Sequence, residues 1–308
     1  MERRDFLKAA GFTLGAAMLP WASARAEGGA VGVGMCDWNV GTSCDPELIP
    51  LAAKAGVEGL QVSVGTRPNW IPLRENKMRQ RYVELGKQYQ ITFHSIAAGG
   101  ILNDIPLATE PQSAVYVIDA LEAAKALGAK NILMAFFGNG DLRLTDSNGE
   151  FIERKKDNFS EYVLDSKKIS RVVEVLRQIV PRAEDAGVAL GLENTLTAAQ
   201  NLDIIDQVGS SWVQVYYDIG NSTHYGYDVP AELRLLGNDR LCEVHIKDWK
   251  RSVFSLEEGE VNMTAAAEAL KQIGFNKWYC LETSGREDKF IPDTRDNVAY
   301  VKKMFHMV

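Results

Sequence analysis

Four residues of the types that bind divalent metal ions are spaced along the second half of the 308-residue chain. Glu193, Asp218 and His245 are separated by 25 and 27 residues, and Glu282 follows 37 residues later. Each ends a short apolar run that favours a β-strand and is then broken by Gly, Asn, Asp or Ser. Three carboxylates and one imidazole suit Mn²⁺, Mg²⁺ or Co²⁺ better than a thiolate-bound structural zinc ion. We therefore predict a divalent-metal site at these four residues, with Mn²⁺ as the first choice.

Each of the four residues has a simpler explanation when it is taken alone. An acidic residue at the end of a strand often caps the helix that follows. A single histidine is more often a hydrogen-bonding residue of the core than a metal ligand. Four suitable residues at four successive strand ends are harder to explain in this way, so the joint pattern favours a metal site.

The spacing of the four residues also indicates which elements position them. An interval of this length holds one strand, one helix and two loops of a repeating β/α unit. Eight such units follow residue 26, and no G-x-G-x-x-G motif follows the first strand to suggest a dinucleotide-binding fold. The strands are expected at 31–36, 59–64, 91–95 and 131–137 and in the runs that begin at 188, 213, 241 and 278, and the helices at 45–55, 75–89, 112–127, 166–186, 197–208, 230–236, 264–273 and 294–305. The fold class is therefore α/β, a single (β/α)8 TIM barrel over 27–308, with the four residues on the rim where active sites of this fold lie.

Alternation along each strand predicts which side chains share the barrel interior with the four residues. Gly191 and Ala189 should point inward with Glu193 and leave room around its carboxylate. Tyr216 should point inward with Asp218.

The run that ends at His245 carries further polar residues. Glu243 is expected to share the inward face with His245, whereas Cys242 is expected to point away from it. Lys247 and Asp248 follow directly and are candidates to orient His245 or to contact a substrate. Lys247 is expected to point first away from the barrel axis.

The chain has four cysteines, at 36, 44, 242 and 280. Cys280 is expected inward with Glu282, so it should not bridge to the outward Cys242. In an oxidising compartment, Cys36 and Cys44 could form a disulfide. Buried thiols that act as small apolar residues are the better interpretation.

The N-terminus has the pattern of a targeting segment rather than of fold. The run Arg3-Arg4-Asp5-Phe6-Leu7-Lys8 resembles the twin-arginine export motif, a weakly apolar stretch follows, and Ala24-Arg25-Ala26 offers a cleavage site. We predict a cleavable twin-arginine (Tat) signal peptide over 1–26, the Tat translocase as a partner during export, and a periplasmic or otherwise exported mature protein. A disordered basic tail and an uncleaved anchor are the alternatives.

Charge and loop length add two expectations. The net charge is −7 with no basic cluster beyond the N-terminus, which argues against a nucleic-acid partner. The segment 138–165 is long, polar and rich in charge, and it follows the fourth expected strand on the ligand rim. Such loops are often lids or binding loops, although a surface insertion is the alternative.

The motifs around the four residues resemble a known family. The runs Leu192-Glu193-Asn194, Tyr217-Asp218-Ile219-Gly220-Asn221, Val244-His245-Ile246-Lys247-Asp248 and Leu281-Glu282 resemble the sugar phosphate isomerase/epimerase family of the xylose isomerase-like TIM barrel superfamily, over about 27–308. Similarity to the ketose 3-epimerases of that family implies that these four residues are the metal ligands and that Glu193 and Glu282 are also the catalytic acid/base pair. It implies as well that Arg251 binds a substrate oxygen.

The chain differs from the ketose 3-epimerases at two substrate-contacting positions. A histidine three residues after the metal-binding Asp is replaced by Asn221, and a second Glu six residues after the first is replaced by Ala199. His224 could replace the missing histidine, although a histidine of a surface loop is the preferred interpretation. These differences weigh against simple ketose 3-epimerisation.

Further substrate-binding candidates lie near the same rim. Besides Asn221 and Asp248, they are His94, Trp38 and Trp70. His94 could bind substrate hydroxyls or be satisfied by neighbours inside the barrel. The two tryptophans could stack on a sugar face or pack under a loop.

The leading functional prediction is an isomerase. It is a divalent-metal-dependent sugar isomerase/epimerase that removes a proton next to the carbonyl of a sugar or keto-sugar through an enediolate. A metal-dependent lyase or dehydratase acting on keto-glycosides or inosose-like polyols is the alternative, because the same ligands support elimination. A non-catalytic sugar-binding barrel is a third hypothesis. The expected partner is thus a small-molecule carbohydrate, and a homo-oligomer is left open.

Overall fold

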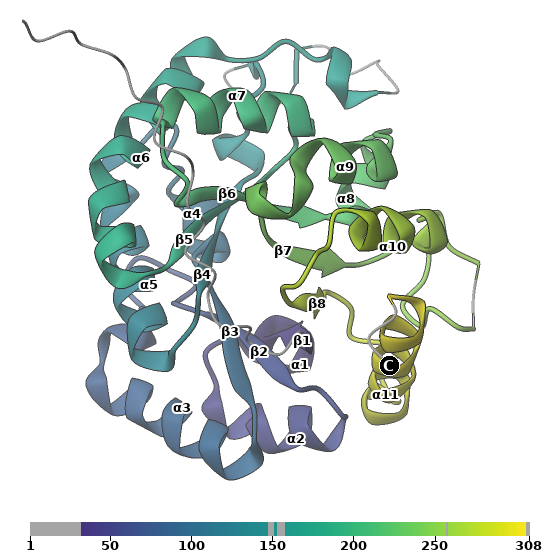
Figure 1. The fold of residues 1–308 in the computed structure, drawn as a ribbon. Coiled ribbons are helices and arrows are strands. Elements are labelled where there is room, and N and C mark those ends of the chain that lie inside the picture. The colour runs from purple at the N-terminus through teal and green to yellow at the C-terminus, as the bar shows by residue number, and fades with distance from the viewer. Residues whose placement is uncertain (1–31, 147–150, 153–157, 257, 306–308) are drawn as a thin grey trace, which may run out of the picture.

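The computed structural model describes residues 32–146, 151–152, 158–256 and 258–305. Its eight strands are parallel to their neighbours and follow chain order around a closed barrel, in which β8 pairs with β1. The helices lie outside the strands (Figure 1), so the predicted (β/α)8 barrel is confirmed. The predicted signal peptide, 1–26, lies outside the described residues. Within the described part of the chain, no helix is long and apolar enough to cross a membrane.

The elements match the expected alternation of strand and helix. The strands are β1 (Val33–Cys36), β2 (Gly59–Ser63), β3 (Thr92–Ala97), β4 (Asn131–Phe136), β5 (Ala189–Asn194), β6 (Val213–Asp218), β7 (Leu241–Ile246) and β8 (Tyr279–Leu281). The helices are α1 (Asp37–Val40), α2 (Ile49–Lys54), α3 (Asn76–Tyr89), α4 (Gly99–Asp104), α5 (Ala114–Leu127), α6 (Ser166–Ala186), α7 (Ala198–Val208), α8 (Ile219–His224), α9 (Val229–Arg240), α10 (Met263–Gln272) and α11 (Phe290–Met304). Short 3₁₀ helices are η1 (Pro46–Leu48), η2 (Pro72–Arg74), η3 (Pro111–Ser113), η4 (Gly138–Gly140) and η5 (Phe159–Glu161).

Local signals fix the ends of the helices that were predicted most closely. The side chain of Asp165 caps the first turn of α6, and Gly187 ends that helix in the left-handed conformation. Thr197 and Gln200 form a capping box at the start of α7, and Gly209 ends it in the same way as Gly187.

Three short helices were not predicted. They are α1, α4 and α8, and each follows the end of a strand on the ligand rim, after β1, β3 and β6. They are only four to six residues long, so they contain too few turns to produce a hydrophobic period. The helix expected at 230–236 extends to Arg240, with a non-helical break at Gly237.

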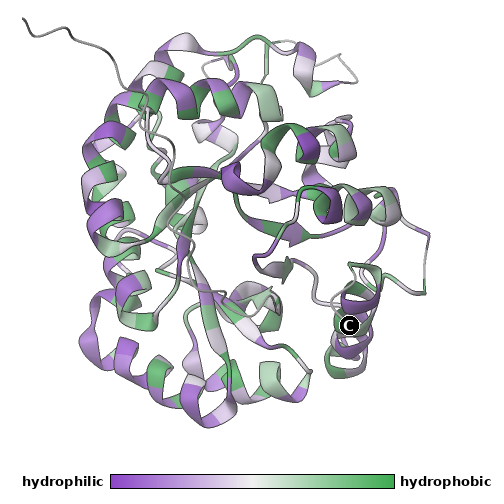
Figure 2. Ribbon diagram, viewed as in Figure 1, coloured by the Kyte–Doolittle hydropathy of each residue, from purple (hydrophilic) through white to green (hydrophobic). Residues whose placement is uncertain are grey.

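The predicted alternation holds along β5 and β6. Leu190 and Leu192 belong to the large apolar core between barrel and helices, whereas Ala189 and Tyr216 belong to a smaller cluster inside the barrel. Figure 2 shows hydrophobic and hydrophilic residues alternating along the outer helices, as is typical of helices with one buried and one exposed face. The space beside Gly191 is not free, however, because a Cβ there would lie 2.6 Å from the sulfur of Cys242.

Two β-bulges change which residues point inward. On β3, Leu60 pairs with Phe93 and Gln61 pairs with Ser95, so His94 is an extra residue. On β7, Val215 pairs with Leu241 and Tyr216 with Glu243, so Cys242 is an extra residue. The prediction that Cys242 points away from the barrel interior is wrong, because the bulge turns it into the inner cluster beside Tyr216.

The long segment after β4 is packed against the barrel where the structure describes it. Arg143 is buried, forms an ion pair with Asp141 at 3.1 Å, and lies 4.3 Å from the ring centre of Phe159. Asp141 in turn accepts a hydrogen bond from the hydroxyl of Thr195, at the end of β5, at 2.7 Å. This part of the segment is thus held against the rim, which does not fit a loose surface insertion.

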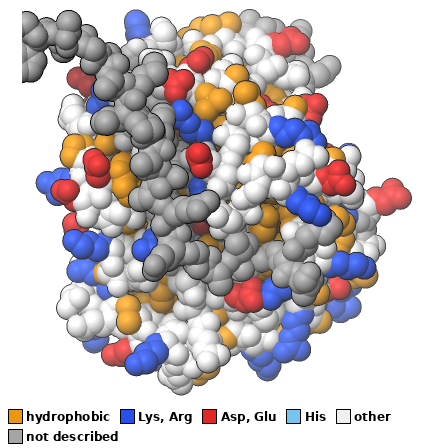
Figure 3. Space-filling view, in the orientation of Figure 1, with side chains coloured by type: hydrophobic (Ala, Val, Ile, Leu, Met, Phe, Trp, Pro, Cys, Tyr) orange, Lys and Arg blue, Asp and Glu red, His pale blue; other side chains and the backbone are white. Residues whose placement is uncertain are grey.

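All four cysteines are free and buried, as the preferred interpretation expected, and Cys36 and Cys44 are not bridged. The outer surface carries both signs of charge. Figure 3, seen from the side of Figure 1, shows acidic and basic side chains distributed over that face with apolar side chains between them.

Candidate metal centre

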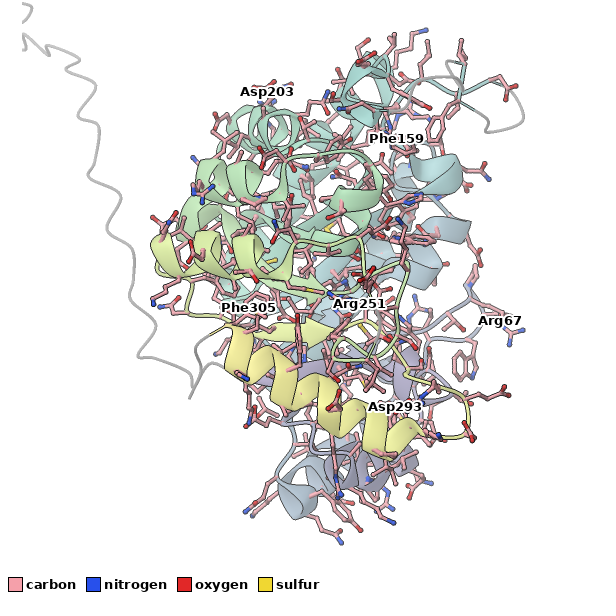
Figure 4. The ribbon with its side chains drawn as sticks, turned by 90° about the vertical axis from the view of Figure 1, so that its right-hand side faces the viewer. Arg67, Phe159, Asp203, Arg251, Asp293 and Phe305 are labelled. Atoms are coloured by element: carbon pink, nitrogen blue, oxygen red, sulfur yellow. The ribbon has the colours of Figure 1, made fainter. Side chains whose placement is uncertain are left out.

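The four predicted ligands meet at the carboxyl end of the barrel. Glu193, Asp218 and His245 lie in the last two residues of β5, β6 and β7, and Glu282 directly follows β8. One potential ligand atom from each lies within 4.8 Å of the others. The Nδ1 atom of His245 is 3.3 Å from Glu193 Oε1, 4.0 Å from Asp218 Oδ2 and 3.4 Å from Glu282 Oε2. In Figure 4 this rim faces right, on the side of Arg67, Phe159 and Arg251, while Phe305 lies on the opposite side.

The carboxylate of Asp218 has two separate roles. Its Oδ1 atom caps α8 by accepting hydrogen bonds from the backbone N–H groups of Gly220 and Asn221, at 2.7 and 2.9 Å. Its Oδ2 atom is buried and has no hydrogen-bond partner. The helix-capping explanation of this residue is therefore correct for one oxygen, and the second oxygen is available to the cluster.

The side chain of Gln61 orients His245. The amide nitrogen of Gln61 donates to Ser95 Oγ at 3.1 Å and to the hydroxyl of Tyr216 at 2.8 Å. Its amide oxygen therefore faces His245 Nε2, at 3.1 Å, and accepts the proton of that nitrogen when the imidazole is neutral. The Nδ1 atom is then left with a lone pair directed at the three carboxylates, as a metal ligand requires.

Polar residues continue below the cluster into the barrel. The hydroxyl of Tyr216 forms a short hydrogen bond with Glu243, which also accepts from the side-chain amide of Asn131 at 2.9 Å. His94 Nδ1 lies 2.7 Å from Glu243, and its ring stacks on Trp278 at 4.9 Å. His94 is thus buried inside the barrel and paired with Glu243 through Nδ1, which favours the second of its two interpretations over contact with a substrate.

Lys247 lies at the cluster, contrary to the prediction that it points away. Its Nζ atom is 3.1 Å from Glu282 Oε2 and 3.7 Å from Asp218 Oδ2. The physical reason is the strand period itself, because residues two apart share a face and Lys247 is two residues after His245. One cation of the chain therefore occupies the edge of a cluster of three acids.

The charges of the cluster shift its titration. Burial raises the pKa of Asp218 to about 8, and the negative charge of Glu282 adds to the effect. Burial alone would also raise the pKa of Glu282, but the positive charges of His245 and Lys247 hold it below its usual value. For His245, burial alone would lower the pKa, but contacts with Cys280 and with Glu193 raise it. The metal-free cluster therefore keeps protons that a divalent ion would replace.

The cluster fits a divalent metal ion. Asp218 Oδ2 and His245 Nδ1 are both buried without a hydrogen-bond partner, which is costly unless another species binds there. The donor set is three carboxylates and one imidazole, a set suited to hard or borderline divalent ions. A structural zinc site at these four residues would be expected to include thiolates, and none belongs to this set.

A sequence model of the xylose isomerase-like TIM barrel matches residues 49–304, which is most of the chain. The protein belongs to the xylose isomerase-like TIM barrel family. All four residues of the cluster lie within the matched range.

Relatives in this family are epimerases of sugars or sugar-like phosphates. The 2-epi-5-epi-valiolone 7-phosphate 2-epimerase of Actinoplanes sp. strain SE50/110 is 26% identical over 224 residues, covering 70% of this chain and 72% of that protein. The L-ribulose-5-phosphate 3-epimerase UlaE of Escherichia coli K12 is 25% identical over 248 residues, covering 78% and 82%.

Solved structures show the same fold at lower identity. D-psicose 3-epimerase from Clostridium cellulolyticum H10, with D-tagatose, has a TM-score of 0.70 at 17% identity and covers 89% of this chain and 99% of its own. The 3-keto-D-glucoside 4-epimerase YcjR from E. coli has a TM-score of 0.68 at 17% identity, with the same coverage. At these identities the two structures show the fold of the family and not the substrate of this chain.

Two of the predicted substrate-binding residues hold the loop after β7. Asp248 is buried and accepts hydrogen bonds from three backbone N–H groups of its own loop. Arg251 donates from Nε to Asp248 at 3.0 Å and from Nη1 to the carbonyl oxygen of Phe254 at 2.7 Å. The structure thus gives both residues a role in the shape of the loop, and contact with a substrate stays a prediction for them.

The other candidates divide between the site and the periphery. Trp38, in α1, lies edge-on to the ring of His245 with the centres 6.4 Å apart, so it is at the cluster. Asn221 is buried in α8 next to Asp218. Trp70 is exposed in the loop after β2, where it pairs with Arg67. Contact with a substrate stays a prediction for these three residues.

Two residues of the site were missed by the sequence analysis. Gln61 lies in the middle of β2 and reaches His245, on β7, across the barrel interior. Trp249 follows the motif Val244-His245-Ile246-Lys247-Asp248 directly and is largely exposed. Its position next to that motif is the signal that could have identified it.

Proposed function

We propose that the protein is a divalent-metal-dependent sugar epimerase or isomerase that removes a proton next to a carbonyl group. The observation that carries the proposal is the placement of two carboxylates around one imidazole. Glu193 and Glu282 each approach His245 Nδ1 to within 3.4 Å, from β5 and from the end of β8. In the barrel, β6 and β7 lie between the strands of the two carboxylates. Glu193 and Glu282 would therefore contact a bound sugar from different sides.

Glu193, Asp218, His245 and Glu282 would hold the ion, and Mn²⁺ is the first choice for this donor set. When bound, a divalent ion would polarise a substrate carbonyl and favour loss of the neighbouring proton. Glu193 and Glu282 are positioned to take and return that proton. Gln61 keeps His245 in one tautomer, and Lys247 keeps Glu282 ionised by its charge.

Elimination is the second candidate, because Lys247 brings an additional proton donor to the site. A lyase needs a group that protonates the departing oxygen after the first proton is removed. The Nζ atom of Lys247 carries N–H donors 3.1 Å from Glu282 Oε2, on the inner side of the rim. A keto-glycoside or an inosose-like polyol with a leaving group next to the enolised carbon would then lose it.

We also propose that the protein acts outside the cytoplasm. The motif Arg3-Arg4-Asp5-Phe6-Leu7-Lys8 and the site Ala24-Arg25-Ala26 support a Tat signal peptide over 1–26. Export of this kind would favour free sugars or glycosides over phosphorylated intermediates of the cytoplasm.

Proton exchange with solvent tests the proposed chemistry. The mature protein from Glu27, loaded with Mn²⁺, is incubated in D₂O with free ketoses, keto-glycosides and inososes, and the C–H signals are followed by NMR. Deuterium uptake should occur with at least one class and should be lost in Glu193→Gln and Glu282→Gln. Glu258→Gln, at an exposed acid of the loop after β7, is the control and should exchange normally.

The outcome separates the candidate functions. Deuterium uptake at a carbon whose configuration is inverted in the product supports epimerisation. Deuterium uptake with loss of a substituent supports the lyase. Tight Mn²⁺ binding without uptake on any substrate contradicts both enzymes and favours a sugar-binding barrel.

A further inference from the structure

Trp249 is an exposed aromatic residue beside the metal cluster. It lies in the loop after β7, four residues after His245, and 54% of its surface is exposed. Tryptophan is enriched at binding interfaces, because its ring offers apolar faces and its N–H can donate a hydrogen bond. The surroundings of this ring decide whether it is suited to that role.

The ring of Trp249 is held in place although it is exposed. Its Nε1 atom donates to the side-chain oxygen of Asn221 at 3.0 Å. Its ring stacks on that of His224, with the centres 4.8 Å apart and an angle of 21° between the planes. An aromatic side chain that is already fixed loses little conformational entropy when a ligand covers it.

The same ring is linked directly to the cluster. Lys247 Nζ lies 5.1 Å from the centre of the Trp249 ring and 3.1 Å from Glu282 Oε2. Asn221, which holds the indole, also donates its backbone N–H to Asp218. The indole is therefore separated from the proposed metal ligands by a single lysine head group.

We propose that Trp249, with His224 behind it, forms a second binding position for a ring that is attached to the reacting sugar. This inference rests on the proposed function. The apolar C–H face of a pyranose, or an aryl group, would cover the exposed indole while the keto-sugar lies at the cluster. The substrate class is accordingly a keto-glycoside with a ring as its second part. A free ketose in the cluster has no further ring to reach Trp249.

Ligand binding to the Mn²⁺-loaded mature protein tests the proposal. Dissociation constants are measured by calorimetry for a free ketose and for methyl, phenyl and glucosyl keto-glycosides. In Trp249→Ala, affinity for the phenyl or glucosyl compound should fall about tenfold. Affinity for the methyl compound and the free ketose should change less than about twofold. The phenyl and glucosyl compounds then show whether an aryl group or a sugar is preferred.

Three controls make the result specific. Leu256→Ala removes a side chain of the same loop that is 62% exposed, and it should change no affinity. Trp249→Phe keeps an aromatic face and should recover most of the affinity for the two-ring compounds. The Mn²⁺ dissociation constant of Trp249→Ala should equal that of the wild type, since a merely unfolded loop would disturb the cluster.

Several outcomes would overturn the proposal. They are equal losses for one-ring and two-ring compounds, no loss with any compound, no binding of two-ring compounds to the wild type, and a monomer–dimer change in Trp249→Ala, which would make the indole a contact between copies. The proposed function can fail independently of the second binding position. If two-ring compounds bind in a Trp249-dependent way but no deuterium is exchanged, the proposed reaction is rejected and the binding position is kept. If free ketoses exchange deuterium equally in the wild type and in Trp249→Ala and no two-ring compound binds, the binding position is rejected and the reaction is kept.

Discussion

At the scale of single residues, the candidate metal centre is marked by two buried atoms that the rest of the protein leaves without hydrogen-bond partners. Asp218 caps α8 with one oxygen and presents the other to the cluster. His245 is held through Nε2 by Gln61, so Nδ1 faces the carboxylates. Such a division of roles keeps the ligands fixed in the absence of the ion, which lowers the entropy cost of binding it.

The raised pKa of Asp218 predicts how stability depends on pH. Because the folded-state pKa is about 8, above its ordinary value, the metal-free fold loses stability as the pH rises through that value. Mn²⁺ replaces the proton, so the increase in melting temperature caused by Mn²⁺ should be larger near about pH 8 than near about pH 6, by a few degrees. Differential scanning fluorimetry measures this. Asp218→Asn should abolish the metal effect, and an effect that is larger at the lower pH would contradict the assignment.

Lys247 should compete with the metal ion for the acidic cluster. Its ammonium lies 3.1 Å from Glu282 Oε2, so Lys247→Met removes a positive charge that repels the ion. Mn²⁺ affinity, measured by electron paramagnetic resonance, should rise by roughly tenfold. Turnover should fall at the same time if Lys247 also donates a proton or a hydrogen bond to the substrate.

The matched control for that variant is Lys250→Met, at an exposed lysine of the same loop. It should leave Mn²⁺ affinity within about twofold. Weaker Mn²⁺ binding in Lys247→Met would show instead that Lys247 stabilises the arrangement of the acids.

The sequence predicted that Glu193, Asp218, His245 and Glu282 come together, but not the residues that orient them. Glu193, Asp218, His245 and Glu282 each end a strand, and position at a strand end can be read from the apolar run before it. Gln61 lies within β2 and reaches His245 across the barrel interior, and a contact between strands that are not neighbours leaves no local pattern in the sequence. The prediction that Lys247 points away is wrong, because residues two apart on a strand share a face and Lys247 is two residues after His245.

At the scale of elements, two bulges determine the composition of the barrel interior. The extra residues His94 and Cys242 point inward next to Ser95 and Glu243, where regular strands would alternate. Strict alternation therefore correctly predicted β5, β6 and the inward Glu243 of β7, and it failed for Cys242. Bulges leave no consistent mark in composition, so the inward position of Cys242 could not be found from the sequence.

The bulge in β7 predicts a sensitive position on β5. Because Cys242 fills the space beside Gly191, a Cβ at residue 191 would lie 2.6 Å from its sulfur and 2.8 Å from the carbonyl oxygen of Ile132. Gly191→Ala should lower the free energy of unfolding by about 1–3 kcal/mol, measured by urea denaturation. Gly100→Ala is the control, because a Cβ there meets only Thr66 at 3.8 Å or more. Equal stability of the two variants would contradict the described packing.

At the scale of the whole molecule, the closed barrel brings together residues that are far apart in the chain. The strands that carry or directly precede the four clustered residues are consecutive, β5 to β8, so one half of the barrel supplies the candidate metal centre. The (β/α)8 fold was predictable because eight units repeat the same order of apolar run, turn and helix. The short rim helices α1, α4 and α8 were not, because so few residues form no hydrophobic period.

Export is a prediction about the full-length chain. If the N-terminal motif is a Tat signal, replacing both Arg3 and Arg4 with Lys should leave most of the protein in the cytoplasm in its uncleaved form, because the motif is recognised through its arginine pair. Cell fractionation and intact-mass measurement check this. Lys8→Arg keeps the pair and should be exported normally, and equal export of the double variant would argue against the Tat route.

The most direct test of the central claim is the metal dependence of solvent exchange at matched occupancy. Wild type, Glu193→Gln and Glu282→Gln are stripped with a chelator, reloaded until each holds the same amount of Mn²⁺, and compared in D₂O with the best substrate. The structure predicts deuterium uptake only in the reloaded wild type, with each variant bound to metal but inactive. Uptake that survives stripping, or that persists in both variants, would contradict a metal-dependent proton transfer by Glu193 and Glu282.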